Sequence, residues 1–322
     1  MTSHARPIAL RTVLGNYPHT LALKRGEIAS AAVALDFVEV KPTNLAFKPM
    51  VREQQFDVCE MAIVTFLQAK AYGKPLVLLP AVMLARFQHG CMLYNSARGA
   101  LAPHELAGRR VGVRAYSQTT GVWLRGILAN DYGLDVARVR WVTFEDAHVA
   151  EYTDPPEVER APAGHDMTAM LLAGEIDAAI YGAGLPADPR LESVIPAPDA
   201  AAQAWHRKYR AAPVNHLVAV KAALARSSPQ AVAEVYRLLR AAKEAAPAPA
   251  GCRSRAVRHR GEPASARDDH RLFGAAAHDP APPHRRRAVR RDGGADRSGV
   301  RRGYSMIPKS GYRFSEKIML QQ

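Results

Sequence analysis

Residues 106–128 combine an apolar run, a turn of small residues and a helical pattern, an arrangement that is typical of anion-binding sites. Ser117 is predicted to be the N-cap residue of the helix, so the backbone N–H groups that follow it are open. Open amides and the helix dipole both favour negative charge. Arg114 precedes the turn and can add a guanidinium group that matches a carboxylate. The pattern predicts a site for a small carboxylated molecule, and the alternative is an ordinary strand-to-helix turn without a ligand.

Strands and helices are predicted to alternate along most of the chain, and these elements position the turn. Expected strands cover residues 7–14, 32–40, 56–61, 75–82, 90–95, 111–113, 139–144, 176–181 and 216–221. Expected helices cover residues 43–54, 63–72, 119–132, 167–173, 200–210 and 227–246. The segment 146–164 is rich in prolines and acids, so we expect it to be an exposed loop.

This alternation, with two crossings of the chain, predicts an α/β fold of two doubly wound lobes that face a central cleft. We expect residues 1–95 and 214–246 to form lobe 1 and residues 96–213 to form lobe 2. Ligands in such folds bind at the carboxyl ends of strands and between domains. The turn after Gly15, the Glu60 side chain and the Ser117 turn all lie at predicted strand ends.

Positive charge is concentrated at the end of the chain. The 322 residues include 44 Lys and Arg and 30 Asp and Glu, for a net charge of +14, and residues 247–322 hold 17 of the former and 7 of the latter. The rest of the chain is nearly balanced, so we do not expect nucleic acid as a partner. The tail has few large apolar residues, which predicts disorder, and the alternative is a basic arm that binds nucleic acid.

A third interpretation of the tail is a frameshift. When the codons for residues 257–291 are shifted by one base, permissive codon choices yield an amphipathic, helix-forming sequence with a balanced charge. We therefore hypothesise that a frameshift replaced the C-terminus. Sequencing the DNA tests this, because codons that cannot yield the alternate frame would exclude it.

The cysteines and the N-terminus predict a location. Cys59, Cys91 and Cys252 form no C-x-x-C pair and have no metal-ligand spacing. An odd number of cysteines without a recognisable signal peptide suits a reducing cytoplasm. No run approaches 18 apolar residues, so we expect no membrane segment. A cytoplasmic protein without a metal site is the expectation.

Six blocks of sequence follow one another in the order of a known family. They are VLGNYPHT at 13–20, FDVCEM at 56–61, ARFQHGCMLYN at 85–95, GRRVGVRAYSQTTGVWLRGILANDYG at 108–133, GEIDAAIYG at 174–182 and APVNHLVAVK at 212–221. Through these blocks the region from about residue 7 to 246 resembles the 4,5-dihydroxyphthalate decarboxylase family, and the alternate frame of the tail resembles the family's C-terminal block. The chain departs from the family at Gln88, where a second basic residue is common, and in lacking that C-terminal block as written.

The resemblance implies the fold of type 2 periplasmic binding proteins. It also implies the loss of one carboxylate from 4,5-dihydroxyphthalate to give protocatechuate, without an organic cofactor. The chain would then be a carboxy-lyase of phthalate degradation whose partner is a small aromatic carboxylate, and a homo-oligomer is left open. Alternatives are a solute-binding protein of an ABC-type transporter that binds a small carboxylate, and a cytoplasmic synthase of menaquinone or thiamine precursor pathways.

Decarboxylation of such a ring needs a group that holds the retained carboxylate and a general acid that protonates carbon. For the retained carboxylate we expect the amides after Ser117, which include those of Gln118 and Thr119, together with Arg114. Arg86 is a second candidate for anion binding. The alternative for either arginine is a surface ion pair.

Three residues are candidates for proton transfer. His89 or His216 could deliver the proton, and the alternative for each is a structural histidine. Glu60 could accept a ring hydroxyl or orient a histidine, and the alternative is a cap of the following helix. Residues that could line a site for an aromatic ring are Tyr17, Tyr116 and Trp123, of which Trp123 is also a candidate for the core.

Overall fold

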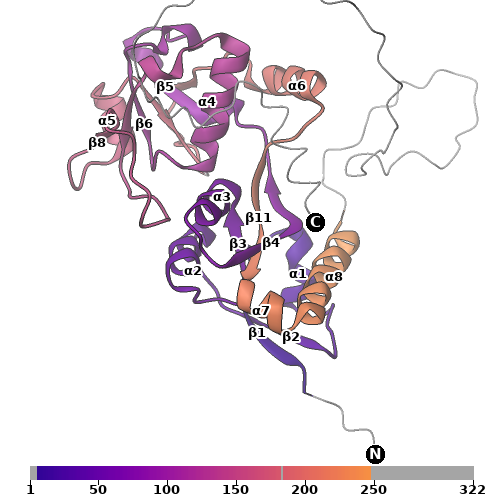
Figure 1. Ribbon diagram of the computed structural model, residues 1–322. Helices are drawn as coiled ribbons and strands as arrows, with labels where there is room; N and C mark the ends of the chain where they lie inside the picture. Colours follow the sequence, from indigo (N-terminus) through magenta and orange to yellow (C-terminus); the bar gives the residue numbers. More distant parts are fainter. Residues whose placement is uncertain (1–5, 183, 248–322) are drawn as a thin grey trace, which may run out of the picture. The chain divides into compact units, whose positions relative to one another are not determined.

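The computed structural model describes residues 6–182 and 184–247, which form a mixed α/β structure with two sheets (Figure 1). The predicted α/β fold with two sheets is therefore confirmed. The expected tail and its frameshift lie outside the described residues, apart from Pro247. The cleft between the lobes stays a prediction. No helix in the described ranges combines the length and the apolar character that crossing a bilayer requires.

The first sheet has five strands in the order β2-β1-β3-β11-β4. Its strands are β1 (Ile8–Val13), β2 (Val33–Phe37), β3 (Val58–Ala62), β4 (Leu76–Ala85) and β11 (Val214–Lys221). β1 runs parallel to β2 and β3, whereas β11 runs antiparallel to β3 and β4. Because β11 returns from a later part of the chain and lies beside β3, it brings distant residues to the centre of this sheet.

Helices cover the five-stranded sheet on both faces (Figure 1). One face packs against α1 (Pro18–Lys24) and α8 (Pro229–Ala245), which follows the short α7 (Ala222–Ser227). The other face packs against the 3₁₀ turn η1 (Thr43–Ala46), α2 (Phe47–Glu53) and α3 (Ile63–Ala71). Every residue of β3 is buried as a result, including the acidic Glu60. A strand covered on both faces is expected to be apolar, so a carboxylate at its centre requires specific partners.

The second sheet has six strands in the order β10-β5-β9-β6-β7-β8. Its strands are β5 (Met92–Asn95), β6 (Arg110–Val113), β7 (Arg140–Thr143), β8 (Glu159–Arg160), β9 (Ala178–Ile180) and β10 (Leu191–Ser193). Its helices and 3₁₀ turns are η2 (His89–Cys91), η3 (Ser96–Arg98), η4 (Pro103–Leu106), α4 (Thr119–Tyr132), η5 (Val136–Arg138), α5 (Met167–Ala173) and α6 (Pro198–Tyr209). β5 pairs with β9 and β10, so the chain changes sheet before β5 and not after residue 95 as expected.

The N-cap residue of α4 differs by one position from the prediction. Gln118, not Ser117, is the N-cap residue, and its side chain does not cap the helix. The Gln118 N–H donates to the carbonyl of Ala115 at 2.9 Å, so the turn closes on itself just before Thr119, the first helical residue. The helix ends at Gly133, whose φ of 64° is the left-handed conformation that glycine favours.

Exposed and half-buried residues make up most of the segment 146–164, as its prolines and acids predict, but its start is packed into the core. Val149 is 1% exposed and belongs to the core cluster beneath α2 and α3, and Ala147 is also buried. Arg52 of α2 donates from Nε to the carbonyl of His148 and from Nη2 to that of Ala147, both at 2.9 Å. This segment therefore reaches from β7 to the helices of the first sheet and places His148 there.

Candidate active site

A hydrogen-bonded pair of His216 and Glu60 lies at the centre of the five-stranded sheet. Val218 of β11 is opposite Glu60 of β3, and His216 is opposite Ala62. His216 and Glu60 are thus diagonal neighbours on the same face, a spacing that long side chains can bridge. His216 Nδ1 lies 2.7 Å from Glu60 Oε1. The antiparallel register of β11 and β3 therefore builds the pair from residues that are 156 positions apart.

Glu60 is completely buried and receives two further hydrogen bonds. The Tyr17 hydroxyl donates to Oε1 at 2.7 Å, and the Gly15 N–H donates to Oε2 at 2.7 Å. Burial opposes the charged form, but the bonds from His216, Tyr17 and Gly15 outweigh it and hold the pKa of Glu60 below its ordinary value. Glu60 is therefore a carboxylate. It does not cap the following helix, because the N-cap residue of α3 is Ala62.

The turn between β1 and α1 holds Tyr17 against Glu60. The Thr20 hydroxyl accepts the Tyr17 N–H at 2.9 Å and donates to the Gly15 carbonyl at 2.7 Å, while Pro18 begins the helix. A Cβ on residue 15 would stand 2.5 Å from Cε2 of Tyr17, so only glycine allows this ring so close to the backbone. Burial and the Glu60 charge raise the pKa of Tyr17, which therefore stays a phenol.

The Glu60 carboxylate determines which nitrogen of His216 carries a proton. A carboxylate offers only acceptors, so His216 must donate from Nδ1–H. His216 Nε2 then has no hydrogen-bond partner in the described part of the chain, and the His216 side chain is 19% exposed. Glu60 also stabilises the imidazolium whenever Nε2 takes up a proton. The pair can therefore deliver or accept a proton at His216 Nε2.

A second histidine lies beside this pair. The Phe47 ring makes edge-to-face contacts with His216 at 5.2 Å and with His148 at 5.6 Å between ring centroids. His148 Nδ1 is 2.7 Å from the Thr65 hydroxyl. Burial first, and then the charges of Arg114, Lys48, Arg52 and His216, lower the pKa of His148 to about 3. His148 is therefore a neutral imidazole surrounded by cationic groups.

The low pKa of His148 predicts a loss of stability in acid. Histidine in the unfolded chain titrates near 6.5, so between pH 6.5 and about 3 the unfolded state binds a proton that the folded state does not. Stability from this residue is complete above pH 6.5 and falls as the pH drops. When the pH is lowered from about 8 to 5, we expect the unfolding free energy of the unaltered chain to fall by about 2 kcal/mol more than that of His148→Gln.

Urea unfolding at the two pH values measures this difference. The matched control is His104→Gln, because His104 is exposed and lies outside the site. Equal acid sensitivity of the His148→Gln variant and the unaltered chain would show that His148 is protonated in the folded protein.

Several groups of the predicted anion-binding turn are bonded to the protein. The Gln118 amide is used within the turn, and the Thr119 hydroxyl accepts the Val64 N–H at 3.4 Å. Ser117 is not the helix cap, as described above. Arg114 Nη1 donates to Glu145 Oε2 at 3.1 Å, in a half-exposed ion pair. Arg114 therefore forms an ion pair, which was the alternative expected for it, and the Arg114 charge also acts on His148.

The other predicted site residues lie in separate surroundings. Arg86 Nη2 donates to the Gly182 carbonyl, and His89 is 2% exposed with its ring 6.3 Å from that of Trp205. The Tyr116 ring lies against the guanidinium of Arg125, 4.1 Å from ring centroid to Cζ. Trp123 Nε1 donates to the Val214 carbonyl at 2.9 Å, which ties α4 to the start of β11. No described contact joins these residues to Glu60 or His216.

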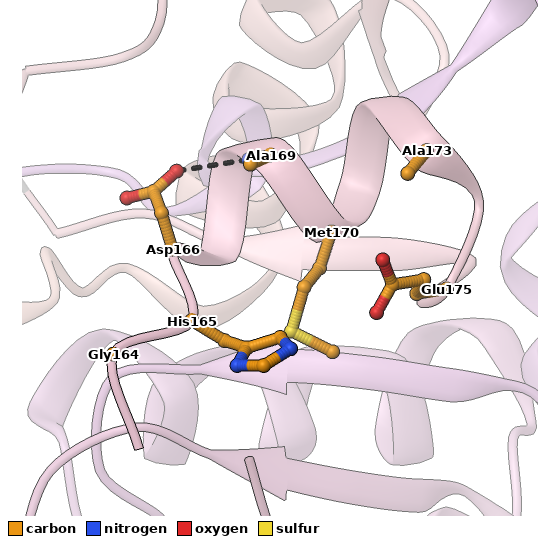
Figure 2. A pocket seen from close by; sticks show the side chains of 7 residues that line it. All are labelled: Gly164, His165, Asp166, Ala169, Met170, Ala173 and Glu175. Carbon is orange, nitrogen blue, oxygen red and sulfur yellow. Dashed lines mark hydrogen bonds between the residues drawn. The ribbon is translucent and has the colours of Figure 1, made fainter. Parts of the chain in front are cut away.

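Two surface hollows are lined by residues other than His216, His148 and their partners. One, of about 400 Å³, borders α5, and Figure 2 shows the His165 ring beside the Met170 side chain, with Glu175 at the end of the helix. Asp166 is occupied as the helix cap, since its Oδ1 accepts the Ala169 N–H at 2.8 Å (Figure 2). The other, of about 520 Å³, borders Glu105 and Glu192. No group of His, Cys, Asp and Glu in the described ranges is arranged to hold a metal ion.

Sequence reasoning missed Phe47, Lys48 and His148 as members of this site. Phe47 and Lys48 look like ordinary residues of an amphipathic helix, and His148 lies in the segment that was expected to be an exposed loop. The only local signal is the pair Val149 and Tyr152, which are apolar among polar neighbours and pack into the first sheet's core. A single sequence does not show which helices that segment meets.

Comparison with known proteins gives relatives of one kind. No family model matches the chain. A 4,5-dihydroxyphthalate decarboxylase of Comamonas testosteroni is 27% identical over 241 residues, which cover 69% of this chain and 71% of that protein. One of Pseudomonas putida is 29% identical over 211 residues, or 62% of this chain and 81% of that protein. The predicted resemblance is confirmed.

Solved structures also align with the chain. The alkanesulfonate-binding protein SsuA from Xanthomonas axonopodis pv. citri, bound to MOPS, has a TM-score of 0.45 and 16% identity, with 74% of each chain covered. The desulfurization enzyme DSZB has a TM-score of 0.40 and 17% identity, with 73% of this chain and 75% of that chain covered.

Proposed function

We propose that this protein is a carboxy-lyase that removes one carboxylate from a dihydroxylated aromatic dicarboxylate, converting 4,5-dihydroxyphthalate to protocatechuate. The observation that carries the proposal is the His216–Glu60 pair, a histidine fixed by a buried carboxylate, whose Nε2 has no hydrogen-bond partner among the described residues. The names of the two relatives support the reaction class and the substrate. The expected cytoplasmic location remains part of the proposal.

The chemistry asks for one proton and no external oxidant or reductant. A ring hydroxyl para to the departing carboxylate pushes electron density toward the carbon that bears it. His216 Nε2 gives its proton to that carbon, and a C–H bond forms. The C–C bond to the carboxylate then breaks, carbon dioxide leaves, and the electron pair of that bond restores the aromatic ring. Glu60 stabilises the His216 imidazolium before the proton is transferred and holds the imidazole ring in place during the transfer.

Cationic groups near the histidines suit a dianionic substrate. Lys48, Arg52 and Arg114 all act on His148 electrostatically, and Arg52 is committed to backbone carbonyls. Lys48 makes no ion pair within the described residues, and the partner of Arg114 is the half-exposed Glu145. We therefore assign the retained carboxylate to Lys48 and Arg114, with the substrate replacing Glu145 as the partner of Arg114. Phe47 contacts His216 and Tyr17 contacts Glu60, so both are aromatic groups that border the pair.

The test is turnover of 4,5-dihydroxyphthalate by the chain as printed and by a version with the reading frame restored after residue 246. We expect equal amounts of carbon dioxide and protocatechuate, and in D₂O one deuterium at the carbon that lost its carboxylate. Chromatography with mass spectrometry measures both products. Saturable binding without carbon dioxide in either version would overturn the lyase in favour of a solute-binding protein. Activity of the restored version alone would support both the lyase and the frameshift.

A further inference from the structure

His148 lies in a segment whose backbone is fixed by contacts of its own. Arg52 donates to the carbonyls of Ala147 and His148, and Val149 is buried in the core beneath α2 and α3. Glu151 adds an ion pair with Lys74 at 2.5 Å. The backbone around His148 is therefore fixed on both sides, so the position of its ring is determined by the fold.

The ring itself is also fixed, but only through one nitrogen. Nδ1 lies 2.7 Å from the Thr65 hydroxyl, and the ring edge meets Phe47. Nε2 has no hydrogen-bond partner in the described part of the chain and is not among its fully buried polar atoms. A histidine that served packing alone would not need Thr65 and Arg52 to orient it while its second nitrogen stays open. The arrangement is that of a group held ready for a ligand.

The Phe47 ring meets both imidazoles edge to face, with interplanar angles of 89° to His216 and 85° to His148. Both imidazoles therefore border one aromatic ring, and the charge of His216 acts on His148, so the two side chains are candidates to bind one planar ligand. The neutral imidazole offers one hydrogen bond and no charge, whereas Lys48 and Arg114 offer charge. Lys48 and Arg114 suit the carboxylates of the ligand, so a hydroxyl is the group that suits the neutral His148.

We infer that His148 is a positioning residue that binds, through Nε2, the ring hydroxyl of the substrate that is not para to the departing carboxylate. This rests on the proposed function, and it names what makes the site select a dihydroxylated ring. Thr65 orients His148 by holding Nδ1. The hydroxyl bound by His148 fixes the rotation of the ring, so that the carbon to be protonated faces His216.

The test compares two substrates that differ by that hydroxyl, 4,5-dihydroxyphthalate and 4-hydroxyphthalate, with kcat/KM and calorimetric Kd measured for each. The monohydroxylated compound keeps the para hydroxyl and so keeps its electronic assistance. The unaltered chain should prefer the dihydroxylated compound, and His148→Phe should reduce that preference about 10-fold, mostly through KM. Thr65→Val, which keeps the side-chain shape, should reduce it by a smaller factor in the same direction.

The outcomes separate this inference from the proposed function. Equal losses on both substrates in His148→Phe and Thr65→Val would assign His148 a structural role and overturn the inference, with decarboxylation intact. If His148→Phe fails to fold, Thr65→Val decides the question alone. If the unaltered chain makes no carbon dioxide, the proposed function fails, and the ratio of the two Kd values still shows whether His148 recognises the hydroxyl.

Discussion

Replacing His216 by glutamine is expected to lower kcat for 4,5-dihydroxyphthalate by about 100- to 10,000-fold, the usual contribution of a positioned general acid. Glutamine can still donate to Glu60 Oε1, so the hydrogen bond of 2.7 Å that Glu60 receives from this position has a replacement. It cannot carry a proton to carbon. The loss should therefore fall on kcat, and Kd for the substrate should change little.

His104→Gln is the matched control, because it removes one exposed histidine and leaves the site untouched. Steady-state turnover, with substrate binding by calorimetry, separates the two parameters. A folded His216→Gln variant whose kcat stays within about 10-fold of the unaltered chain would show that another group supplies the proton. His89 would not be the first alternative, because its contacts are with Phe87 and Trp205 and not with Glu60 or His216.

Helix ends with local signals were predicted well from the sequence. The two helices 119–132 and 167–173 have the expected bounds. Each is followed by a glycine in the left-handed conformation, and Asp166 caps the second through the Ala169 N–H. These signals act over three or four residues, so they can be seen in one sequence. The N-cap of α4 was wrong by one residue because a turn bond within 115–118 competes with capping by Ser117.

Features that depend on pairing between distant segments were predicted less well. β5 has the apolar pattern of a strand, but nothing in that pattern says which sheet it joins. The segment 146–164 has few apolar residues, yet Val149 enters a core whose other members come from the first sheet. Tertiary burial of a short apolar stretch overrides a loop-like composition, and it cannot be derived from local pattern.

In the candidate site too, single residues could be predicted from the sequence, but their contacts with distant residues could not. Glu60 was chosen because it lies at a predicted strand end and His216 because it lies at the second crossing of the chain, and their pairing follows from the register between β3 and β11. That register is set by the whole sheet, so the sequence could not establish it. Arg114 was chosen for its place before the turn, and its ion pair with Glu145 depends on the neighbouring loop.

The second large effect is expected from Glu60→Gln, which should lower kcat about 1,000-fold although the side chain keeps its size. Gly15 N–H requires an acceptor, so the amide oxygen should turn toward it and the amide nitrogen toward His216 and Tyr17. That nitrogen donates, so His216 Nδ1 must become an acceptor and its proton must move to Nε2. The imidazolium then faces an amide donor and loses the carboxylate that stabilises it.

Two measurements tie this loss to the tautomer of His216. Nitrogen-15 NMR of the histidine ring should show Nδ1–H in the unaltered chain and Nε2–H in Glu60→Gln, a change that a purely structural role for Glu60 would not produce. Tyr17→Phe is the control, since it removes one donor to Glu60 but leaves the carboxylate and its bond to His216, and kcat should fall by less than about 10-fold. If Glu60→Gln retains the Nδ1–H tautomer and still loses activity, Glu60 acts on the substrate itself, and the orienting role assigned to it here is wrong.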